Sequence, residues 1–408
     1  MHLDFRAVPR RLVVVGAGMA GLRTLAELRA AGYDGHLTIL GAEGVPPYDR
    51  PPLSKELLSR TEPAWLSAEL GADVHDLADD VLLDSPARRL LVTDDGVRLA
   101  LSDGRELEAD GAVLACGSHA VRPAGWEAAL TLHTAADAEQ LRSHLAPGVR
   151  LVIIGAGWIG GEVAGVAAAA GCEVTVLEAG PAPLVRQLGA ELGARTVRWY
   201  AEAGVALHLD ARVVDVATDG VRVAGGRSFP AEVVLCAVGA RPATDWLTGS
   251  IPMLPTGHVP VDGAGASDVP GVWAVGDCAA RENAKFGPVP GGHWSAALID
   301  PAPLARELMG LDSPVAEPAP YVYSAQLGHN LAVFGRVSPG ELVTRGDPAE
   351  GPWTTLTIDD GVLTGAVIAD RPRDVTAVRK LLGGAELPRL DPRTAGDESV
   401  NLRSAVVG

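Results

Sequence analysis

The sequence predicts an α/β protein with two Rossmann-like domains and a small α+β C-terminal domain. Two observations predict this fold. A strand–glycine turn–helix–strand pattern occurs twice, and short apolar segments followed by an amphipathic helix close the chain. The 408 residues are 47% hydrophobic and 21% charged, which is enough for two or three globular domains.

The repeated pattern reads "RRLVVVGAGMAGLRTLAELRAAGYDGHLTIL" at 10–40 and "VRLVIIGAGWIGGEVAGVAAAAGCEVTVLEA" at 149–179. In G-x-G-x-x-G, the first glycine makes a tight turn, the second lets the backbone approach a pyrophosphate, and the third lets the helix pack on the strand. The helix then begins with free N–H groups that attract an anion. The sequence therefore predicts two dinucleotide sites, with these glycines: Gly16, Gly18, Gly21, Gly155, Gly157 and Gly160.

The two copies differ where the second strand ends. In the second copy Glu178 follows Gly160 by 18 residues, where a carboxylate accepts hydrogen bonds from an adenosine ribose and repels a 2′-phosphate. This favours NADH over NADPH. In the first copy Gly41 holds the matching position and the nearest acid is Glu43, which is either a ribose ligand or a solvated loop charge.

Two dinucleotide sites in one chain indicate a relay. One site would hold FAD permanently, and the other would admit a nicotinamide nucleotide in passing. A flavin accepts a hydride and releases single electrons, so the protein has to bind, orient and tune its cofactors.

Composition and patterning exclude several other classes. The net charge of −17 argues against nucleic-acid binding. Residues 151–172 are nearly uncharged, but their glycines and Glu162 favour a strand–turn–helix over a membrane span, and the N-terminus reads as a strand without a signal peptide. The cysteines have neither C-x-x-C nor zinc spacing, so we expect no metal site. We expect them to be buried, reduced thiols in a cytoplasmic protein. They are Cys116, Cys172, Cys236 and Cys278.

Further segments carry a family resemblance. The segments "SDVPGVWAVGDCA" (267–279), "ADGAVLACGSHAVRP" (109–123) and "AEVVLCAVGARPATDWL" (231–247), with both glycine loops, resemble the two-dinucleotide flavoprotein reductases. "PPYDRPPLSKELL" (46–58) narrows this to the FAD-dependent NADH:ferredoxin reductases, similar to putidaredoxin and rubredoxin reductases of the pyridine nucleotide-disulfide oxidoreductase superfamily. The resemblance extends to "GDESVNL" (396–402) and implies electron transfer from NADH through FAD to a ferredoxin-type iron–sulfur protein serving a P450 or oxygenase.

The resemblance also implies a catalytic pair. Lys55, one of only three lysines in the chain, would lie beside the flavin and pair with Glu162. An ammonium group there stabilises negative charge on reduced flavin, and lysine is compact enough to approach a flat ring. Prolines restrict the loop that carries it. The alternative is a surface lysine after a structural loop.

The same resemblance assigns other cofactor contacts. For FAD, it places Ala20 against the phosphates, Arg50 near the cofactor, Asp277 at the ribityl chain and Trp294 over the dimethylbenzene edge. For the nicotinamide nucleotide, Trp158 would shield the pocket, and Ile159 and Gly239 would complete it. Each tryptophan is alternatively core filling. Residues 40–50 hold no cysteine, so neither a disulfide reductase nor a cysteine-dependent NADH oxidase is expected.

Several positions depart from the family pattern. His133 replaces an FAD-binding arginine, and Gly292 replaces a carboxylate. Tyr323 stands where a tryptophan near the electron exit is expected, and Ala325 replaces an aspartate. Two prolines, Pro301 and Pro303, must break or restart an expected helix. These changes lie outside the nicotinamide half, so hydride uptake from NADH is still expected. They leave the identity of the electron acceptor open.

We expect an FAD-binding domain from 1–114 and 248–318, an NAD-binding domain from 115–247 and a C-terminal interface domain from 319–408, in a monomer or dimer. Ferredoxins are usually acidic, so docking needs a local basic patch. The candidates, which are alternatively scattered solvated side chains, are Arg281, Lys285, Arg336, Arg345, Arg371 and Arg373. Two other functions stay open: an NADH oxidase or diaphorase with a small-molecule acceptor, and a weakly catalytic FAD/NAD-binding sensor or assembly protein.

Overall fold

The computed structural model describes residues 8–312, 317–337 and 340–407. Residues 1–7 of the expected N-terminal segment lie outside this range, as do 313–316, 338–339 and 408 of the predicted domains. The described residues form two compact units, one within 1–49, 64–119 and 240–316, the other within 50–63, 120–239 and 317–408. The three-domain division stays a prediction.

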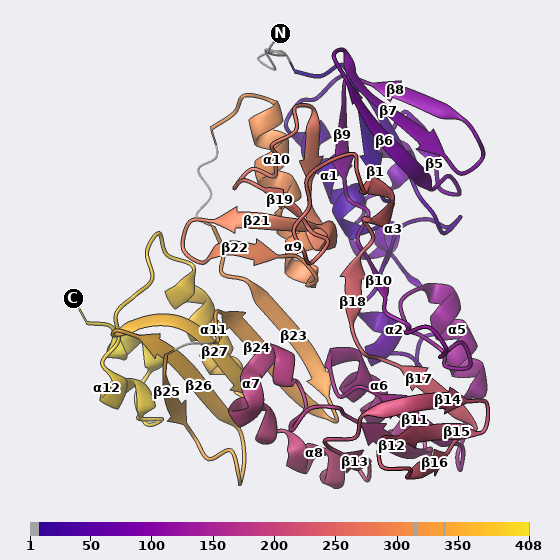
Figure 1. Ribbon diagram of the computed structural model, residues 1–408. Coiled ribbons are helices and arrows are strands. Elements are labelled where there is room, and N and C mark those ends of the chain that lie inside the picture. Colours follow the sequence, from indigo (N-terminus) through magenta and orange to yellow (C-terminus); the bar gives the residue numbers. More distant parts are fainter. Residues whose placement is uncertain (1–7, 313–316, 338–339, 408) are drawn as a thin grey trace. The chain divides into compact units, whose positions relative to one another are not determined.

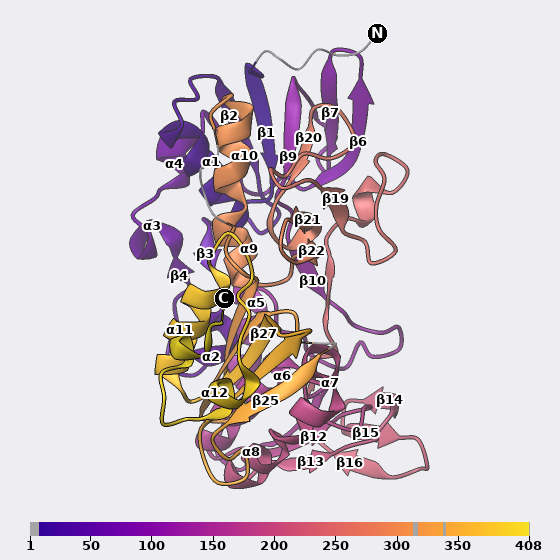
Figure 2. The same cartoon turned by 90° about the vertical axis from the view of Figure 1, so that its left-hand side faces the viewer.

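The first unit is built on a five-stranded parallel sheet (Figure 1). Its strands, in spatial order, are β20 (Val272–Ala274), β9 (Gly111–Leu114), β1 (Arg11–Val15), β2 (His36–Leu40) and β5 (Asp80–Leu82). Four of the five residues of β1 are buried, as expected for a strand covered on both faces. Helix α1 (Met19–Ala30) packs on helix α10 (Pro301–Leu308) beside this sheet (Figure 2).

Smaller elements complete the first unit. Further short strands and short helices surround the sheet. The strands are β3 (Tyr48–Asp49), β4 (Ala64–Trp65), β6 (Ala87–Thr93), β7 (Gly96–Leu101), β8 (Glu106–Ala109), β10 (Ser118–Ala120), β18 (Ala240–Pro242), β19 (Val259–Val261), β21 (Ala279–Asn283) and β22 (Gly287–Pro290). The helices are α3 (Leu66–Glu69), α4 (Val74–Leu77), η1 (Asp245–Leu247), η2 (Gly276–Cys278) and α9 (Trp294–Ile299).

The predicted helix break is present. Helix α9 ends at Ile299, and α10 restarts with Pro301 at its first position, where a proline's missing N–H has no intrahelical partner to lose. Asp300, between them, is buried and forms an ion pair with Arg281 at 3.1 Å.

The second unit contains a four-stranded parallel sheet in the order β13 (Ala206–His208), β12 (Glu173–Leu177), β11 (Arg150–Ile154) and β17 (Val233–Cys236). Helix α6 (Trp158–Ala169) follows β11, which confirms the predicted strand–turn–helix at 151–172. Around them lie α2 (Pro52–Lys55), α5 (Ala135–His144), α7 (Val185–Ala194), α8 (Val197–Glu202), β14 (Val213–Ala217), β15 (Gly220–Val223) and β16 (Ser228–Pro230). Within the described residues no helix has the length and apolar character needed to cross a membrane.

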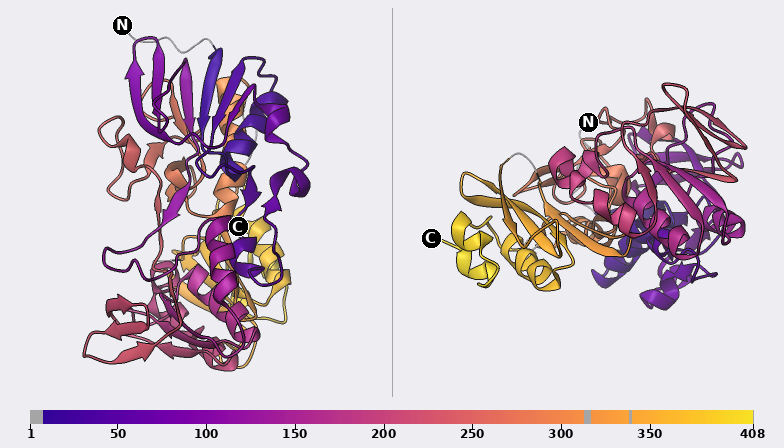
Figure 3. Two further views of the ribbon diagram at one scale, coloured as in Figure 1. Left: turned by 90° about the vertical axis from the view of Figure 1, so that its right-hand side faces the viewer. Right: turned by 90° about the horizontal axis from the view of Figure 1, so that it is seen from below.

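The C-terminal part of the second unit is the expected antiparallel sheet followed by a helix (Figure 3). Its strands, in spatial order, are β23 (Tyr321–Gln326), β24 (His329–Gly335), β27 (Val362–Ala369), β26 (Trp353–Asp359) and β25 (Glu341–Arg345), and its helices are α11 (Pro372–Leu382), α12 (Pro392–Gly396) and η3 (Leu402–Ala405). Leu331, Trp353 and Val367 share one apolar core with Ile153 and Trp199 of the parallel-sheet part. This shared core explains why both parts fall in one compact unit.

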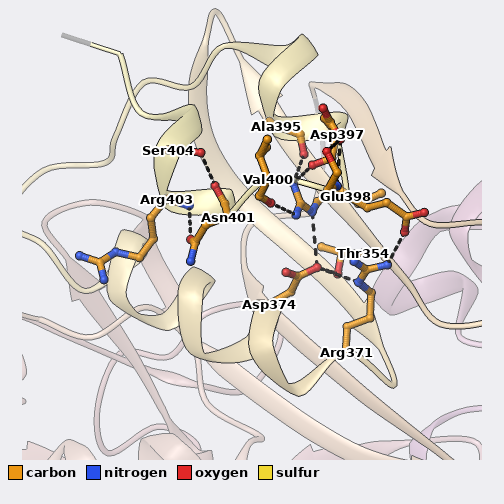
Figure 4. Close-up of polar contacts among 12 residues, drawn as sticks. Thr354, Arg371, Asp374, Ala395, Asp397, Glu398, Val400, Asn401, Arg403 and Ser404 are labelled. Carbon is orange, nitrogen blue, oxygen red and sulfur yellow. Dashed lines mark hydrogen bonds and ion pairs between the residues drawn. The ribbon is translucent and has the colours of Figure 1, made fainter.

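Two members of the predicted basic patch are wrong. Arg345 is only 2% exposed and Arg281 is 9% exposed, so neither belongs to a docking surface. Arg345 donates to the carbonyls of Ala395 and Asp397 and lies 3.5 Å from the carboxylate of Asp374. A third member, Arg371, pairs with Asp374 and with Glu398, both at 2.9 Å (Figure 4).

Candidate functional site

The first glycine loop joins β1 to α1. Gly16 has a φ of +122°, and a Cβ atom there would lie 2.0 Å from the carbonyl oxygen of Ala115. A Cβ on Gly21 would lie 1.9 Å from the carbonyl oxygen of Gly16, so only glycine lets α1 approach the strand. Among the described residues, no atom lies within 4 Å of the Cβ position on Gly18, and no side chain caps the helix that follows. The turn therefore offers open space and unsatisfied N–H groups to a phosphate.

The second loop, between β11 and α6, repeats this geometry. A Cβ on Gly155 would lie 2.5 Å from the carbonyl oxygen of Ala237, and one on Gly160 would lie 2.0 Å from that of Gly155. In the part of the chain that the structure describes, no atom lies within 4 Å of the Cβ position on Gly157, and α6 likewise begins without a side-chain cap. Both loops thus fit a pyrophosphate on the same structural grounds.

Glu178 stands directly after β12, beside the second loop. Its Oε2 accepts from the N–H of Ala156 at 2.8 Å, and its Oε1 accepts from the N–H of Gly180 at 2.7 Å. These bonds fix the carboxylate at the edge of the glycine turn, and each oxygen keeps a second lone pair for a ribose hydroxyl. Burial raises the pKa of Tyr200, on which the charge of Glu178 acts in the same direction.

At the matching position, directly after β2, the residue is Gly41, which has no side chain. A Cβ on Gly41 would lie 2.7 Å from the carbonyl oxygen of Leu83, which explains the glycine. Glu43 is exposed, but its carboxylate accepts from the hydroxyl of Tyr48 at 2.5 Å. It is therefore a tethered loop carboxylate, and its contact with a ribose stays a prediction.

Other predicted FAD residues of the first unit surround η2. Asp277 accepts from the hydroxyl of Ser118 at 2.8 Å and from the N–H of Gly292 at 3.2 Å. Gly292 has a φ of +104°, a conformation that favours glycine, so this departure has a backbone reason. Ala20 is buried, and a Cβ on Gly276 would lie 2.9 Å from it.

Trp294 is not core filling. Its side chain is 43% exposed, and its indole N–H donates to Asp49 at 2.8 Å. His293, just before it, caps α9 through Nδ1, which accepts from the N–H of Ala296 at 3.1 Å. Burial lowers the pKa of His293, and its buried Nε2 has no hydrogen-bond partner among the described residues. Such an orphaned donor fits a pocket completed by a bound group.

The second unit holds the remaining FAD candidates. The guanidinium of Arg50 donates to the backbone carbonyl of His133 at 2.6 Å, and the N–H of His133 donates to Asp137 at 2.9 Å. Asp137 belongs to the capping box of α5, so this box holds the backbone at His133, to which Arg50 bonds.

The predicted pairing of Lys55 with Glu162 is present. Lys55 ends α2, and its Nζ lies 2.9 Å from Oε1 of Glu162, whose side chain is almost fully buried in α6. The hydroxyls of Ser54 and Ser324 donate to the same carboxylate, a contact that sequence reasoning missed. Ser324 is 162 residues from Glu162, and no short-range signal links them.

The nicotinamide-side residues lie around the start of α6 and the end of β17. Trp158 is half-buried and its carbonyl accepts from Gln326 at 2.9 Å, whereas Ile159 is exposed. Gly239 has a φ of +127° with open space where a Cβ would be. Burial raises the pKa of the Cys172 and Cys236 thiols, as expected for structural cysteines.

Comparison with known proteins gives a consistent picture. Residues 10–298 match the model of the pyridine nucleotide-disulphide oxidoreductase family, and 321–406 match the reductase C-terminal family. The chain is 32% identical, over 97% of both chains, to the benzene 1,2-dioxygenase system ferredoxin–NAD(+) reductase subunit of Pseudomonas putida.

Two solved structures resemble the chain over nearly its whole length. One is the ferredoxin reductase for the CYP199A2 system from Rhodopseudomonas palustris, with a TM-score of 0.88, 28% identity, and coverage of 98% of this chain and 100% of that one. The other is the reductase in a covalent putidaredoxin reductase–putidaredoxin complex, with a TM-score of 0.85, 25% identity, and coverage of 97% and 98%.

Proposed function

The chain belongs to the pyridine nucleotide-disulphide oxidoreductase family, and we propose that it is an NADH-dependent flavoprotein reductase that delivers electrons to a ferredoxin-type iron–sulfur protein. The observation that carries the proposal is the combination of two open glycine loops with the Lys55–Glu162 ion pair. The loops bind dinucleotides, and the ion pair supplies a positioned positive charge for electron transfer chemistry.

FAD is the resident cofactor in this proposal, held by the first loop together with Asp277, and the contact of Arg50 with it stays a prediction from the family resemblance. When bound, it supplies the conversion of a hydride into single electrons. The fit rests on the open position at Gly18, the uncapped start of α1 and the unpartnered Nε2 of His293 among the described residues.

NADH is the donor, bound at the second loop. The carboxylate of Glu178 receives the adenosine ribose hydroxyls and repels a 2′-phosphate, so NADPH binds less well. Its two backbone hydrogen bonds support this role, because they hold the negative charge at the edge of the turn.

Lys55 is the electrostatic residue of the site. Its ammonium has three N–H groups, and among the described residues it pairs with Glu162 through one of them, which leaves two for a developing negative charge. Glu162 orients the ammonium and does not itself react.

The acceptor in this proposal is a ferredoxin-type protein, by analogy with the ferredoxin and putidaredoxin reductases to which the chain is similar. A small-molecule acceptor is the second candidate. It is favoured by Tyr323 and Ala325, which stand where the family carries tryptophan and aspartate near the electron exit. We further propose a cytoplasmic location, which the free thiols of the four cysteines support, and a monomer or dimer.

An anaerobic titration of the purified protein, first with NADH and then with NADPH, tests the donor half of the proposal. We expect the visible flavin absorbance to bleach rapidly with NADH and much more slowly with NADPH. In Glu178→Gln the difference between the bleaching rates with NADH and with NADPH should narrow, because the fixed negative charge is gone. If the purified protein holds no flavin, or if NADH does not bleach the flavin, the sensor or assembly function becomes the favoured one.

A further inference from the structure

The carboxylate of Glu162 is held by donors from three separate segments. Lys55 lies 2.9 Å from Oε1, Ser54 donates to Oε2 at 2.5 Å, and Ser324 donates to Oε1. Glu162 is only 3% exposed. Serine hydroxyls and an ammonium group donate hydrogen bonds, so all three groups donate to this carboxylate and together fix its position.

Gln326 fixes the direction of the Ser324 hydroxyl. Its amide N–H groups donate to Oγ of Ser324 at 2.7 Å and to the carbonyl of Trp158 at 2.9 Å. A serine hydroxyl has a single hydrogen. Since Oγ already accepts from Gln326, that hydrogen is directed to Glu162. The result is a directed chain from Gln326 through Ser324 to the ion pair.

The close approach of β23 to α6 depends on two glycines. A Cβ atom on Gly161 would lie 1.9 Å from Oε1 of Gln326, and one on Gly165 would lie 2.9 Å from Cα of Leu327. These glycines are one helical turn apart on α6 and flank Glu162. Their missing side chains let the strand of the C-terminal sheet come within hydrogen-bonding distance of a buried helix carboxylate.

We propose that Ser324 and Gln326 are positioning residues that hold Glu162, and through it Lys55, so that the C-terminal sheet forms part of the Lys55 site. Side chains alternate along a strand, so Ser324 and Gln326 share one face of β23 and Tyr323 belongs to the other. Ser324 and Gln326 are buried, whereas Tyr323 is 46% exposed and donates to Asn330. The role of Lys55 rests on the proposed function, but its positioning does not.

The test uses the scarcity of lysine. The chain contains Lys55, Lys285 and Lys380 only, so acetylation of the flavin-loaded protein, followed by peptide mapping, reports three separate labelling rates. In Ser324→Ala the rate at Lys55 should rise about tenfold, because one hydrogen bond that fixes its counter-ion is lost. Gln326→Met should raise it less. The rates at Lys285 and Lys380 should stay unchanged.

Three controls separate positioning from general damage. Thr357→Val removes another buried hydroxyl from the same sheet and should leave the rate at Lys55 unchanged. Ser54→Ala removes the donor to the other oxygen and should raise the rate. In a Ser324→Ala background, Gln326→Met should add almost nothing, because Gln326 acts through Ser324.

An unchanged Lys55 rate in a folded Ser324→Ala protein would overturn the proposal, as would additive effects of Ser324→Ala and Gln326→Met. If Ser324→Ala does not fold, the rate in Gln326→Met decides. The labelling needs neither NADH nor an electron acceptor, so its failure is distinct from failure of wild-type flavin to be reduced by NADH. As a second readout, the flavin midpoint potential should shift in Ser324→Ala but not in Thr357→Val.

Discussion

At the scale of single residues, His293 combines a capping role with a sensitivity to pH. Its Nδ1 accepts from Ala296 to begin α9, and burial lowers its pKa, with the nearby Asp277 opposing this shift. Protonation would turn Nδ1 into a donor that faces another donor. The neutral form is therefore the stabilising one.

This lowered pKa gives a signed prediction. Because the folded pKa lies below the unfolded value of about 6.5, unfolded chains bind more protons between the two values. The stability is fully present above about pH 6.5 and is lost as pH falls toward the folded pKa, by at most about 1.4 kcal/mol per pH unit for one histidine. His293→Asn keeps a capping acceptor but removes the titrating group. In urea unfolding measured from about pH 5 to about pH 8, the free energy of unfolding should therefore depend less on pH in this variant than in the wild type.

Burial also lowers the pKa of His208 and His258, so part of the slope should remain in the variant. An identical slope in the wild type and His293→Asn would show that His293 does not titrate in this range. His293→Ala, which removes the cap as well, should lower stability at every pH.

Features set by neighbouring residues were predictable from the sequence, whereas distant partners were predictable only where the family resemblance supplied them. The glycine spacings and Glu178 follow from the local chemistry of a phosphate-binding turn, and the family resemblance placed Lys55 against Glu162. Ser324 and Gln326 escaped prediction because their partner lies in a different segment. Arg281 and Arg345 were wrongly assigned to the surface, because a sequence alone does not reveal which arginine finds buried carboxylates and carbonyls.

At the scale of elements, the second glycine loop separates folding from binding. Gly160→Ala should destabilise the protein by about 1–3 kcal/mol, because the new Cβ would meet the carbonyl oxygen of Gly155. Gly157→Ala meets no atom and should cost no more than about 1 kcal/mol as a poorer helix cap. It should nevertheless weaken NADH binding, since a methyl group would stand where the pyrophosphate approaches.

Urea unfolding and equilibrium titration with NAD(+) measure these two properties separately. We expect Gly160→Ala to lose stability, and Gly157→Ala to lose affinity for the nucleotide while it stays folded. Gly157→Ala with unaltered NAD(+) affinity would contradict the assignment of this loop to the nucleotide.

The C-terminal sheet depends on a buried arginine. Arg345 donates to the carbonyls of Ala395, Asp397 and Val400, and thereby ties α12 and the following segment to β25. The same guanidinium lies 3.5 Å from the carboxylate of Asp374, which also accepts from Thr354 at 2.8 Å (Figure 4). Removing the guanidinium would take away one of the positive charges that compensate the buried carboxylate of Asp374.

Arg345→Met should therefore lower the free energy of unfolding by about 3–5 kcal/mol. Arg373→Met, in the same C-terminal region but exposed on α11, is the matched control and should change it by no more than about 0.5 kcal/mol. Urea unfolding of the two variants checks this. Equal stabilities would mean that the buried network is dispensable.

At the scale of the whole molecule, the charge of −17 bears on the choice of acceptor. Like charges slow the encounter with an acidic ferredoxin, so docking depends on a local surface of opposite sign. Of the six basic residues considered for this surface, Arg281, Arg345 and Arg371 are engaged in internal ion pairs. Arg336 and Arg373 are exposed, and Lys285 is partly exposed.

Electron delivery to a protein acceptor is the decisive property to measure. The NADH-reduced protein would be mixed without oxygen with an oxidised [2Fe–2S] ferredoxin, and the iron–sulfur spectrum followed over a range of salt concentrations. We expect rapid reduction of the ferredoxin, with a rate that changes with salt concentration. A flavin that NADH reduces, but that passes electrons to oxygen or a quinone and not to any ferredoxin, would contradict this expectation.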